Sequence, residues 1–154
     1  MIGPMEGPHG IRMIDVGGKP ATLRTARASA RLRALPATID RIRSGGLEKG
    51  DAVATARLAA VMAAKRTSDV VPLCHPLPLD AVDCEIGFEA DAVVIETTVR
   101  ATARTGVEME ALVAAAAAAL AIYDMAKSLD RGMAVEQVRL EEKTGGTRGD
   151  YRRP

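Results

Sequence analysis

The sequence has few aromatic side chains. Its 154 residues include no Trp, one Phe and two Tyr, although hydrophobic residues make up 47% of the chain. A core must therefore be built from Ala, Val, Leu, Ile and Met. Side chains as small as Ala each bury little apolar area. We therefore expect the domain to complete its burial through contacts between subunits, as a homo-oligomer.

The sequence also lacks an excess of charge of one sign and a long hydrophobic run. With a formal net charge of +1, the protein has no overall field that would attract nucleic acid or a membrane surface. The apolar run at residues 114–119 is too short to span a bilayer, and no apolar run near the N-terminus is typical of a signal peptide. We expect a cytoplasmic protein with no nucleic-acid or membrane partner. In that compartment its two cysteines, Cys74 and Cys84, would be free thiols.

The length of the chain suits one domain. Residues 1–13 are rich in Gly and Pro and predict a flexible N-terminal arm, whereas residues 14–146 carry the periodic patterns of a single folded domain. Residues 147–154 are rich in Arg and predict a mobile, basic C-terminal tail.

Hydrophobic periodicity and breaker residues divide this domain into seven elements. Asp51 is a suitable N-cap for a helix, and Gly132 a suitable stop for another. The expected elements are a strand at 23–35, a short helix at 37–43, a helix from Asp51 to about residue 67, strands at 81–89 and 93–102, a helix from 106 to about 129, and a strand at 134–142. Without the short first helix the order is βαββαβ. This order predicts an α+β fold of the ferredoxin-like type, with an antiparallel sheet packed by helices.

Three prolines make residues 70–79 a stiff, extended loop, because proline fixes φ and lacks an N–H. His75 lies in this loop between Pro72 and Pro76. An imidazole held in this way suits a general acid or base or a donor to phosphate, but a structural histidine bonded to a carbonyl fits as well. Adjacent side chains on an extended chain point in opposite directions, so Cys74 and His75 do not easily share a metal ion. We therefore predict no metal site.

The longest predicted helix carries acidic residues near both ends. Glu108 and Glu110 lie in its first turn, where carboxylates favour the helix dipole. Asp124 and Lys127, three residues apart near its end, are either a surface ion pair or a coupled acid and base. Glu110 and Asp124 lie about 21 Å apart along the axis and on roughly one side. If both serve one reaction, the ligand is long or the site combines two subunits.

Three cations border the other long predicted helix. Lys49 precedes its start, where an anion such as phosphate would be favoured, although a loop lysine in water is the simpler explanation. Lys65 and Arg66 lie at its end. There they oppose the negative end of the helix dipole, and they have a possible second role in binding phosphate.

Five stretches together cover most of residues 13–146: MIDVGGKPATLRTARASA, KGDAVATARLAAVMAAKRTSDVVPLCHPLPL, TGVEMEAL, AIYDMAKSLD and VRLEEKTGG. The combination of PLCHPL, TGVEMEAL and YDMAK resembles the MoaC family, the cyclic pyranopterin monophosphate synthases of molybdenum cofactor biosynthesis. One departure is Arg104, where the resemblance leads us to expect Lys; Arg keeps the charge but changes its geometry.

The resemblance implies a ferredoxin-like subunit, assembled as a hexamer of three dimers with active sites at the dimer interfaces. It also implies a lyase that converts (8S)-3′,8-cyclo-7,8-dihydroguanosine 5′-triphosphate to cyclic pyranopterin monophosphate and pyrophosphate. The rearrangement involves no net electron transfer and requires no redox cofactor, and Mg²⁺ is an optional counterion of the triphosphate.

Matched residue by residue, Asp124 and Lys127 correspond to the family's catalytic pair. The residues expected to bind substrate, from the resemblance and from their positive charge, are Lys49, Lys65, Arg66, Leu73, Cys74, His75, Glu108, Met109, Glu110 and Lys143. Two other readings stay open from the residues alone: a non-catalytic nucleotide-binding module and a structural subunit of a larger assembly.

Overall fold

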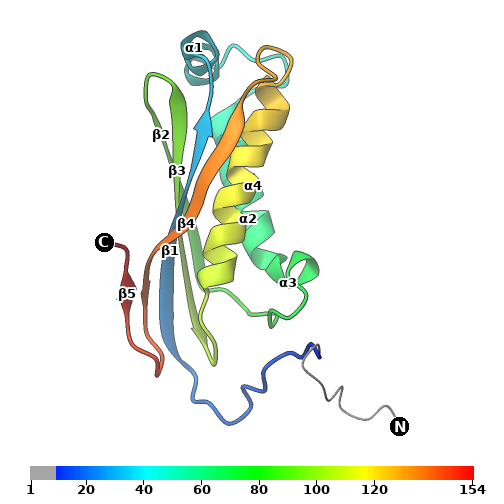
Figure 1. Cartoon of the computed structure of the whole chain (residues 1–154). Coiled ribbons are helices and arrows are strands. Elements are labelled where there is room, and N and C mark those ends of the chain that lie inside the picture. The colour runs from blue at the N-terminus through cyan, green and yellow to red at the C-terminus, as the bar shows by residue number, and fades with distance from the viewer. Residues whose placement is uncertain (1–9) are drawn as a thin grey trace.

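The computed structural model describes residues 10–154. Its sheet is antiparallel, with the strand order β2-β3-β1-β4-β5 (Figure 1). The elements are β1 (Thr22–Arg33), α1 (Pro36–Ser44), α2 (Ala52–Lys65), α3 (Thr67–Val70), β2 (Ala81–Phe88), β3 (Ala92–Ala103), α4 (Glu108–Ala126), β4 (Ala134–Thr144) and β5 (Tyr151–Arg152). The four long strands with α2 and α4 follow the order βαββαβ. The predicted ferredoxin-like α+β fold is therefore confirmed.

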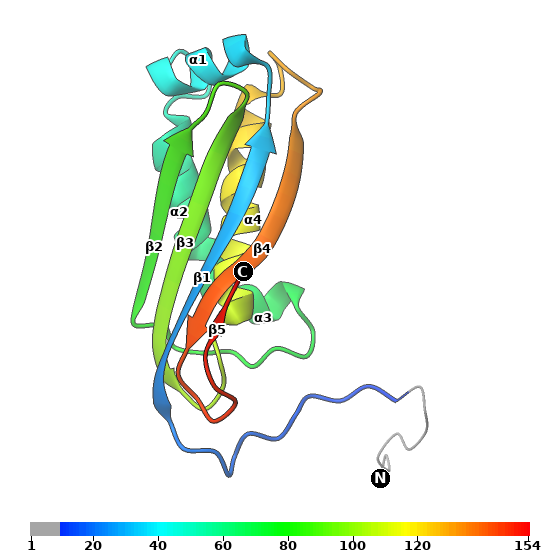
Figure 2. The same cartoon turned by 60° about the vertical axis from the view of Figure 1, so that its left-hand side comes forward.

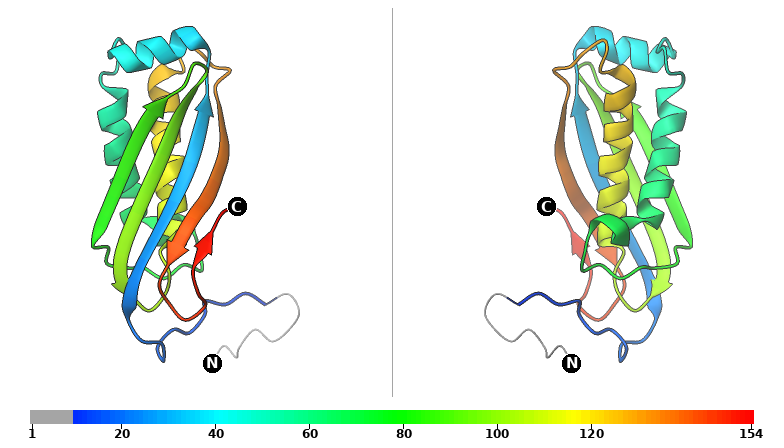
Figure 3. Two further views of the ribbon diagram at one scale, coloured as in Figure 1. Left: turned by 90° about the vertical axis from the view of Figure 1, so that its left-hand side faces the viewer. Right: turned by 90° about the vertical axis from the view of Figure 1, so that its right-hand side faces the viewer.

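Helices α2 and α4 lie side by side on one face of the sheet (Figures 2 and 3). The core between the layers is made largely of small residues. Strand β1 alternates, so that Ala26, Ala28 and Ala30 are buried. Helix α2 buries an alanine at every fourth position, from Ala52 to Ala64, and packs against α4. Small side chains let these elements approach closely, as the composition predicted.

Helix α4 is the one helix within residues 10–154 that is long and apolar enough to cross a membrane by length and composition. Half of that apolar stretch is buried inside the molecule, against the sheet and α2. Its hydrophobicity is therefore explained by packing in the core.

The predicted helix starts have the expected local cause. Asp51 caps α2, because its Oδ1 accepts a hydrogen bond from the backbone N–H of Ala54 at 3.0 Å. The helix ends at Lys65, two residues earlier than predicted, since Arg66 leaves helical geometry and the chain then forms the short α3. Residues 71–80 contain no helix or strand, which confirms the extended proline loop.

The described residues before β1 and the loop between β4 and β5 lie at the same end of the sheet (Figure 1). Residues 1–9 of the predicted arm lie outside the described residues, and the chain from residue 10 runs below the sheet to β1 (Figure 1). The mobility of the tail stays a prediction, but the structure adds β5, which was not predicted. It pairs with β4 through Glu142 opposite Arg152 and Lys143 opposite Tyr151.

Candidate functional site

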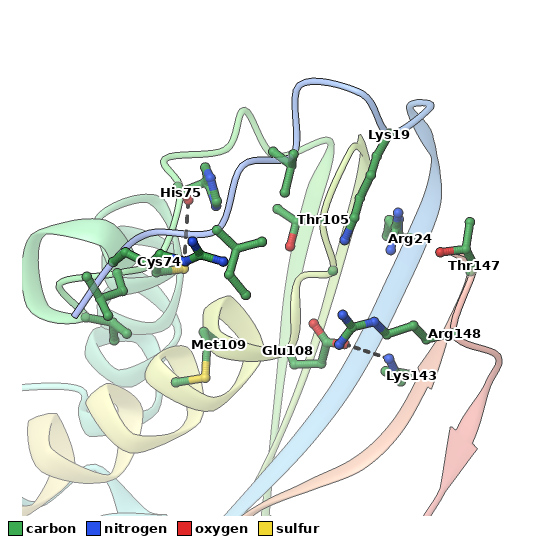
Figure 4. Close-up of a pocket in the computed structure, with 17 residues that line it drawn as sticks. Lys19, Arg24, Cys74, His75, Thr105, Glu108, Met109, Lys143, Thr147 and Arg148 are labelled. Atoms are coloured by element: carbon green, nitrogen blue, oxygen red, sulfur yellow. Dashed lines mark hydrogen bonds and ion pairs between the residues drawn. The ribbon is translucent and has the colours of Figure 1, made fainter. Parts of the chain in front are cut away.

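A cavity of about 430 Å³ lies at the N-terminal end of α4. Four segments meet there: the chain before β1, the proline loop, the start of α4, and the end of β4 with the loop that follows (Figure 4). Six of the ten residues predicted to bind substrate line it, namely Leu73, Cys74, His75, Glu108, Met109 and Lys143. The fold thus brings together residues up to seventy positions apart in sequence.

The proline loop forms one wall of the cavity. A turn in which the N–H of Cys74 donates to the carbonyl of Val71 at 3.1 Å precedes His75, which is half-buried. The Cys74 thiol lies 3.7 Å from Oε1 of Glu110 and 3.8 Å from the carbonyl of His75. Burial, reinforced by the Glu110 carboxyl, raises the pKa of Cys74 to about 11. The thiol therefore stays protonated and acts as a weak donor rather than as a nucleophile.

Glu110 lies beneath this wall, and it is not among the described residues that line the cavity. Its side chain is 2% exposed, and its Oε2 has no hydrogen-bond partner within residues 10–154. Burial raises the pKa of Glu110, because a charged carboxylate is poorly solvated there. In the free chain Glu110 supports Cys74; its contact with substrate stays a prediction.

An ion pair forms part of the lining of the cavity. Lys143 Nζ, at the end of β4, lies 3.2 Å from Oε1 of Glu108, in the first turn of α4. Gly145 and Gly146 follow with φ of 92° and 86°. A Cβ on Gly145 would collide with the carbonyl of Leu23, so only glycine allows β4 to continue closely past β1 at this point. The backbone thereby fixes where Lys143 enters the cavity.

Four cations of the cavity were missed by the sequence reasoning. Two of them, Lys19 and Arg24, lie within the first stretch that carried the family resemblance, which was the available signal. The Nε of Arg24 is buried and has no hydrogen-bond partner within the described residues. Within residues 10–154 the lining holds one carboxylate, from Glu108, and the five cationic side chains of Arg12, Lys19, Arg24, Lys143 and Arg148. This excess of positive charge suits a polyanion such as a triphosphate.

The predicted catalytic pair lies at the opposite end of α4. Asp124 accepts hydrogen bonds from Nζ of Lys127 and Nζ of Lys49, each at 2.8 Å. The two lysines lower the pKa of Asp124 to about 2, and Asp124 in turn raises the pKa of Lys127. At neutral pH the cluster thus holds one carboxylate and two ammonium groups. All three side chains are more than half exposed, so the ion pairs contribute little to stability.

The structure separates this cluster from the cavity. None of its three residues lines the cavity among the residues that the structure describes. Asp124 comes fourteen positions after Glu110 on α4, which corresponds to about 21 Å along the axis. Within one chain, the predicted catalytic groups and the predicted binding wall therefore do not meet.

Lys65 and Arg66 do not join either cluster. Lys65 lines a second groove, of about 380 Å³, with Leu77 and Asp80 between α2 and the start of β2. Arg66 is the C-cap of α2, and it is not among the described residues that line either hollow. The proline loop thus has two sides, with His75 facing the first cavity and Leu77 the second. Substrate binding by Lys65 and Arg66 stays a prediction.

Metal ligation has little geometric support. Across the described part of the chain, no three side chains of His, Cys, Asp or Glu come together in a way that would hold an ion. Cys74 and Cys84 are free thiols, and the pKa of Cys84 is raised to about 11, mainly by burial. The predicted absence of a metal site stays a prediction.

Comparison with known proteins agrees with these motifs. The profile of the MoaC family matches residues 13–146. A cyclic pyranopterin monophosphate synthase of Herpetosiphon aurantiacus is 58% identical, with 100% of this chain and 95% of that protein covered. Proteins of the same name from Streptomyces coelicolor and a Nostoc species are 53% and 50% identical, covering 92% and 96% of this chain and 84% and 89% of their own lengths. The chain belongs to the MoaC family.

Proposed function

We propose that this protein is a lyase of molybdenum cofactor biosynthesis, which converts (8S)-3′,8-cyclo-7,8-dihydroguanosine 5′-triphosphate to cyclic pyranopterin monophosphate and pyrophosphate. The relatives described above bear the name of the enzyme for this step. The observation that carries the proposal in this chain is the cavity itself, where cations from the N-terminal segment through the start of β1 and from the end of β4 with its loop line the same hollow as His75. We place the reaction in the cytoplasm, with no cofactor required and Mg²⁺ as an optional counterion of the triphosphate.

The cationic wall has a defined task in this reaction. A hydroxyl of the substrate attacks the α-phosphate, the bond to the β-phosphate oxygen breaks, and negative charge gathers on the departing pyrophosphate. Fixed cations such as Lys143 and Arg24 stabilise that charge without reorganising. Lys143 is paired with Glu108 in the free chain, so phosphate binding exchanges one carboxylate partner for another anion.

The cluster at Asp124 supplies complementary proton-transfer groups. Building the pterin ring from the purine and ribose requires several proton transfers. In the free chain Asp124 is ionised and Lys127 is protonated, because each holds the other in its charged form. Asp124 is therefore in the form that accepts a proton and Lys127 in the form that donates one, but their mutual pairing makes each a weak base or acid until substrate or a second subunit changes its surroundings.

A dimer would bring these two clusters together. On α4, Met109, Val113, Ala117 and Leu120 recur every three or four residues, so they share one face of the helix. Met109 and Leu120 are 37% and 57% exposed. Leu58 and Met62 on α2 are exposed as well, and beyond α3, which lies over the N-terminal end of α4, no described segment covers the outer side of these two helices (Figure 3). An apolar face of this kind suits a second copy of the chain.

The spacing on α4 suggests how the two copies meet. Where a two-fold axis crosses a helix at a right angle, the helix runs antiparallel to its counterpart, and residue pairs are arranged symmetrically about the axis. Ala116 and Ala117 lie halfway between Met109 and Asp124, and their small side chains allow the two helices to approach closely. The partner's Asp124 then lies beside Met109 at the cavity. Three such dimers would form the hexamer that the family resemblance implies.

The experiment that tests the function is direct turnover. The purified protein, given the cyclised triphosphate, is expected to release pyrophosphate and pyranopterin in a one-to-one ratio, measured by chromatography and a pyrophosphate assay. Tight GTP binding by calorimetry without any turnover of the cyclised substrate would instead identify a nucleotide-binding module.

A further inference from the structure

The basic C-terminal segment is part of the cavity wall. We call residues 143–153 the C-terminal hairpin: it comprises the end of β4, a loop, and β5 with Arg153. Its loop places Gly145, Thr147 and Arg148 in the lining of the cavity, beside Lys143 (Figure 4). The position of Arg148 therefore depends on how this hairpin is held, whereas Lys143 is also held by the pairing of β4 with β1.

Arg153 makes the outermost contacts that hold the hairpin. Its backbone N–H donates to the carbonyl of Glu141 at 2.8 Å, and its Nε donates to the carbonyl of Leu140 at 2.9 Å. The same Nε lies 3.8 Å from the Glu141 carboxylate. A second contact closes the loop, where the N–H of Gly145 donates to Oδ1 of Asp150 at 3.1 Å. The Arg153 side chain thus adds to the backbone hydrogen bonds that hold the end of the chain to β4.

The group that receives Arg153 is itself fixed. Glu141 lies at a register irregularity between β1 and β4, and its side chain is 15% exposed. It also accepts hydrogen bonds from Ser29 on β1 and from Arg139 at 2.7 Å. Burial alone would raise the pKa of Glu141, but these donors outweigh it and the pKa is lowered. The anchor is therefore a charged, well-held carboxylate.

The loop between the anchor and the cavity has little rigidity of its own. Gly145, Gly146 and Gly149 all have positive φ, and glycine loses more conformational freedom on ordering than other residues. Tyr151 and Arg152 are exposed, so β5 adds no side chain to the hydrophobic core. Loss of the anchor would release the loop and leave the core intact.

We propose that Arg153 is a positioning residue: by fastening the C-terminal hairpin to Leu140 and Glu141, it holds Arg148 in place beside Lys143 to bind the triphosphate of the substrate. The inference rests on the proposed function only for the identity of the anion. Arg153 itself lies outside the cavity lining, and it acts through the hairpin. Pre-ordering of the loop lowers the entropic cost of binding.

The test compares Arg153→Ala with Arg152→Ala in the full-length protein. Both variants remove one positive charge from adjacent exposed positions, but only Arg153 makes the contacts to Leu140 and Glu141 described above. We expect Arg153→Ala to raise KM about tenfold with a much smaller change in kcat, and Arg152→Ala to leave both near the wild-type values. Arg153→Lys keeps a donor for the same acceptors and is expected to recover part of the loss. Equal KM values in the two alanine variants would overturn the proposal.

A second readout does not depend on the reaction. Trypsin cleaves after Arg148 only when the loop is free, and the fragment is identified by mass spectrometry. We expect faster cleavage at Arg148 in Arg153→Ala than in Arg152→Ala, with protection restored by inorganic triphosphate. If cleavage follows this pattern but no turnover occurs, the proposed function fails and the anchor stands. If cleavage rates are equal, the anchor fails whatever the activity.

Discussion

The two ends of α4 carry carboxylates in opposite environments. Glu110, in the first turn, is 2% exposed, and burial raises its pKa. Asp124, near the last turn, is more than half exposed, and two ammonium groups lower its pKa to about 2. One helix thus holds a carboxyl that favours the neutral form and another that is ionised at any pH above about 4.

The two environments suggest two different roles, structural support for Glu110 and proton transfer for Asp124. Glu110 already has its surroundings within one chain, where it contacts Cys74 under the proline loop. Asp124 and Lys127 are charged groups of the kind used in proton transfer, but they lie in water, where such groups are weak catalysts. Their proton transfer requires that water be excluded from around them. The exposed apolar face of α4 suggests that a second subunit excludes it.

Asp124→Asn and Lys127→Ala are expected to have the largest effect on turnover. Each removes a proton-transfer group, so kcat is expected to fall by about 10²- to 10⁴-fold. Because both residues are exposed, the melting temperature and the circular dichroism spectrum should stay near those of the wild type. Asp40→Asn on the exposed side of α1 is the matched control. Normal kcat in both variants would show that Asp124 and Lys127 take no part in the reaction.

Ala117→Glu tests whether the face between the two ends is an interface. A charge buried without a partner between two subunits should weaken their association about a hundredfold. Turnover should fall in parallel, because the cluster at Asp124 would no longer face a cavity. Sedimentation velocity and activity are measured on the same samples, with Leu35→Glu, at an exposed position outside α4, as the control. Unchanged association would place the interface on another surface.

His75→Ala tests whether the residues at the cavity end bind substrate and take no part in the chemical step. A residue that orients substrate contributes to the ground state and transition state alike, so KM should rise about tenfold with little change in kcat. This is the reverse of the pattern expected for Asp124→Asn. A fall in kcat as large as that of Asp124→Asn, with KM unchanged, would make His75 part of the chemistry.

Glu110→Gln has the smallest expected effect, on stability and its dependence on pH. The pKa of Glu110 is raised in the folded chain, so the folded state resists its ionisation. The associated stability is fully present below the ordinary pKa of 4.5 and is lost as pH rises through the raised value. The melting temperature of the Gln variant minus that of the wild type should therefore increase by a few degrees from pH 5 to pH 8. The control is Glu48→Gln, at an exposed position. A difference in melting temperature between the Glu110→Gln variant and the wild type that is the same at both pH values would contradict this account.

Local signals predicted most of the fold. Asp51 as a cap, the three prolines of the loop and the alternation in β1 each act over a few residues, so they are readable in sequence. Strand β5 was missed because two residues carry no periodicity, and it forms only where β4 offers a free edge. The long helix was predicted to continue to about residue 129 and ends at Ala126.

The site was predictable only in part, because it is assembled from distant segments. The proline loop and the first turn of α4 were identified from their motifs, and the structure places both at the cavity. Arg12 and Arg148 lie in the predicted flexible arm and the predicted mobile tail. Nothing in the local sequence distinguishes them from arginines exposed to solvent. Their position follows from β1 and β4 being neighbours in the sheet. The burial of Glu110 likewise depends on the proline loop packing over it.

Subunit mixing tests the central claim most directly. At a substrate concentration far below KM, the Asp124→Asn and His75→Ala proteins are each weakly active, and the two are dissociated together and reassociated in equal amounts. If each site takes His75 from one chain and Asp124 from its partner, half of the dimers are mixed and carry one intact site of two, so about a quarter of the wild-type activity returns. If both residues act within one chain, mixing gives no more than the average of the two variants, and the account of a shared site is wrong.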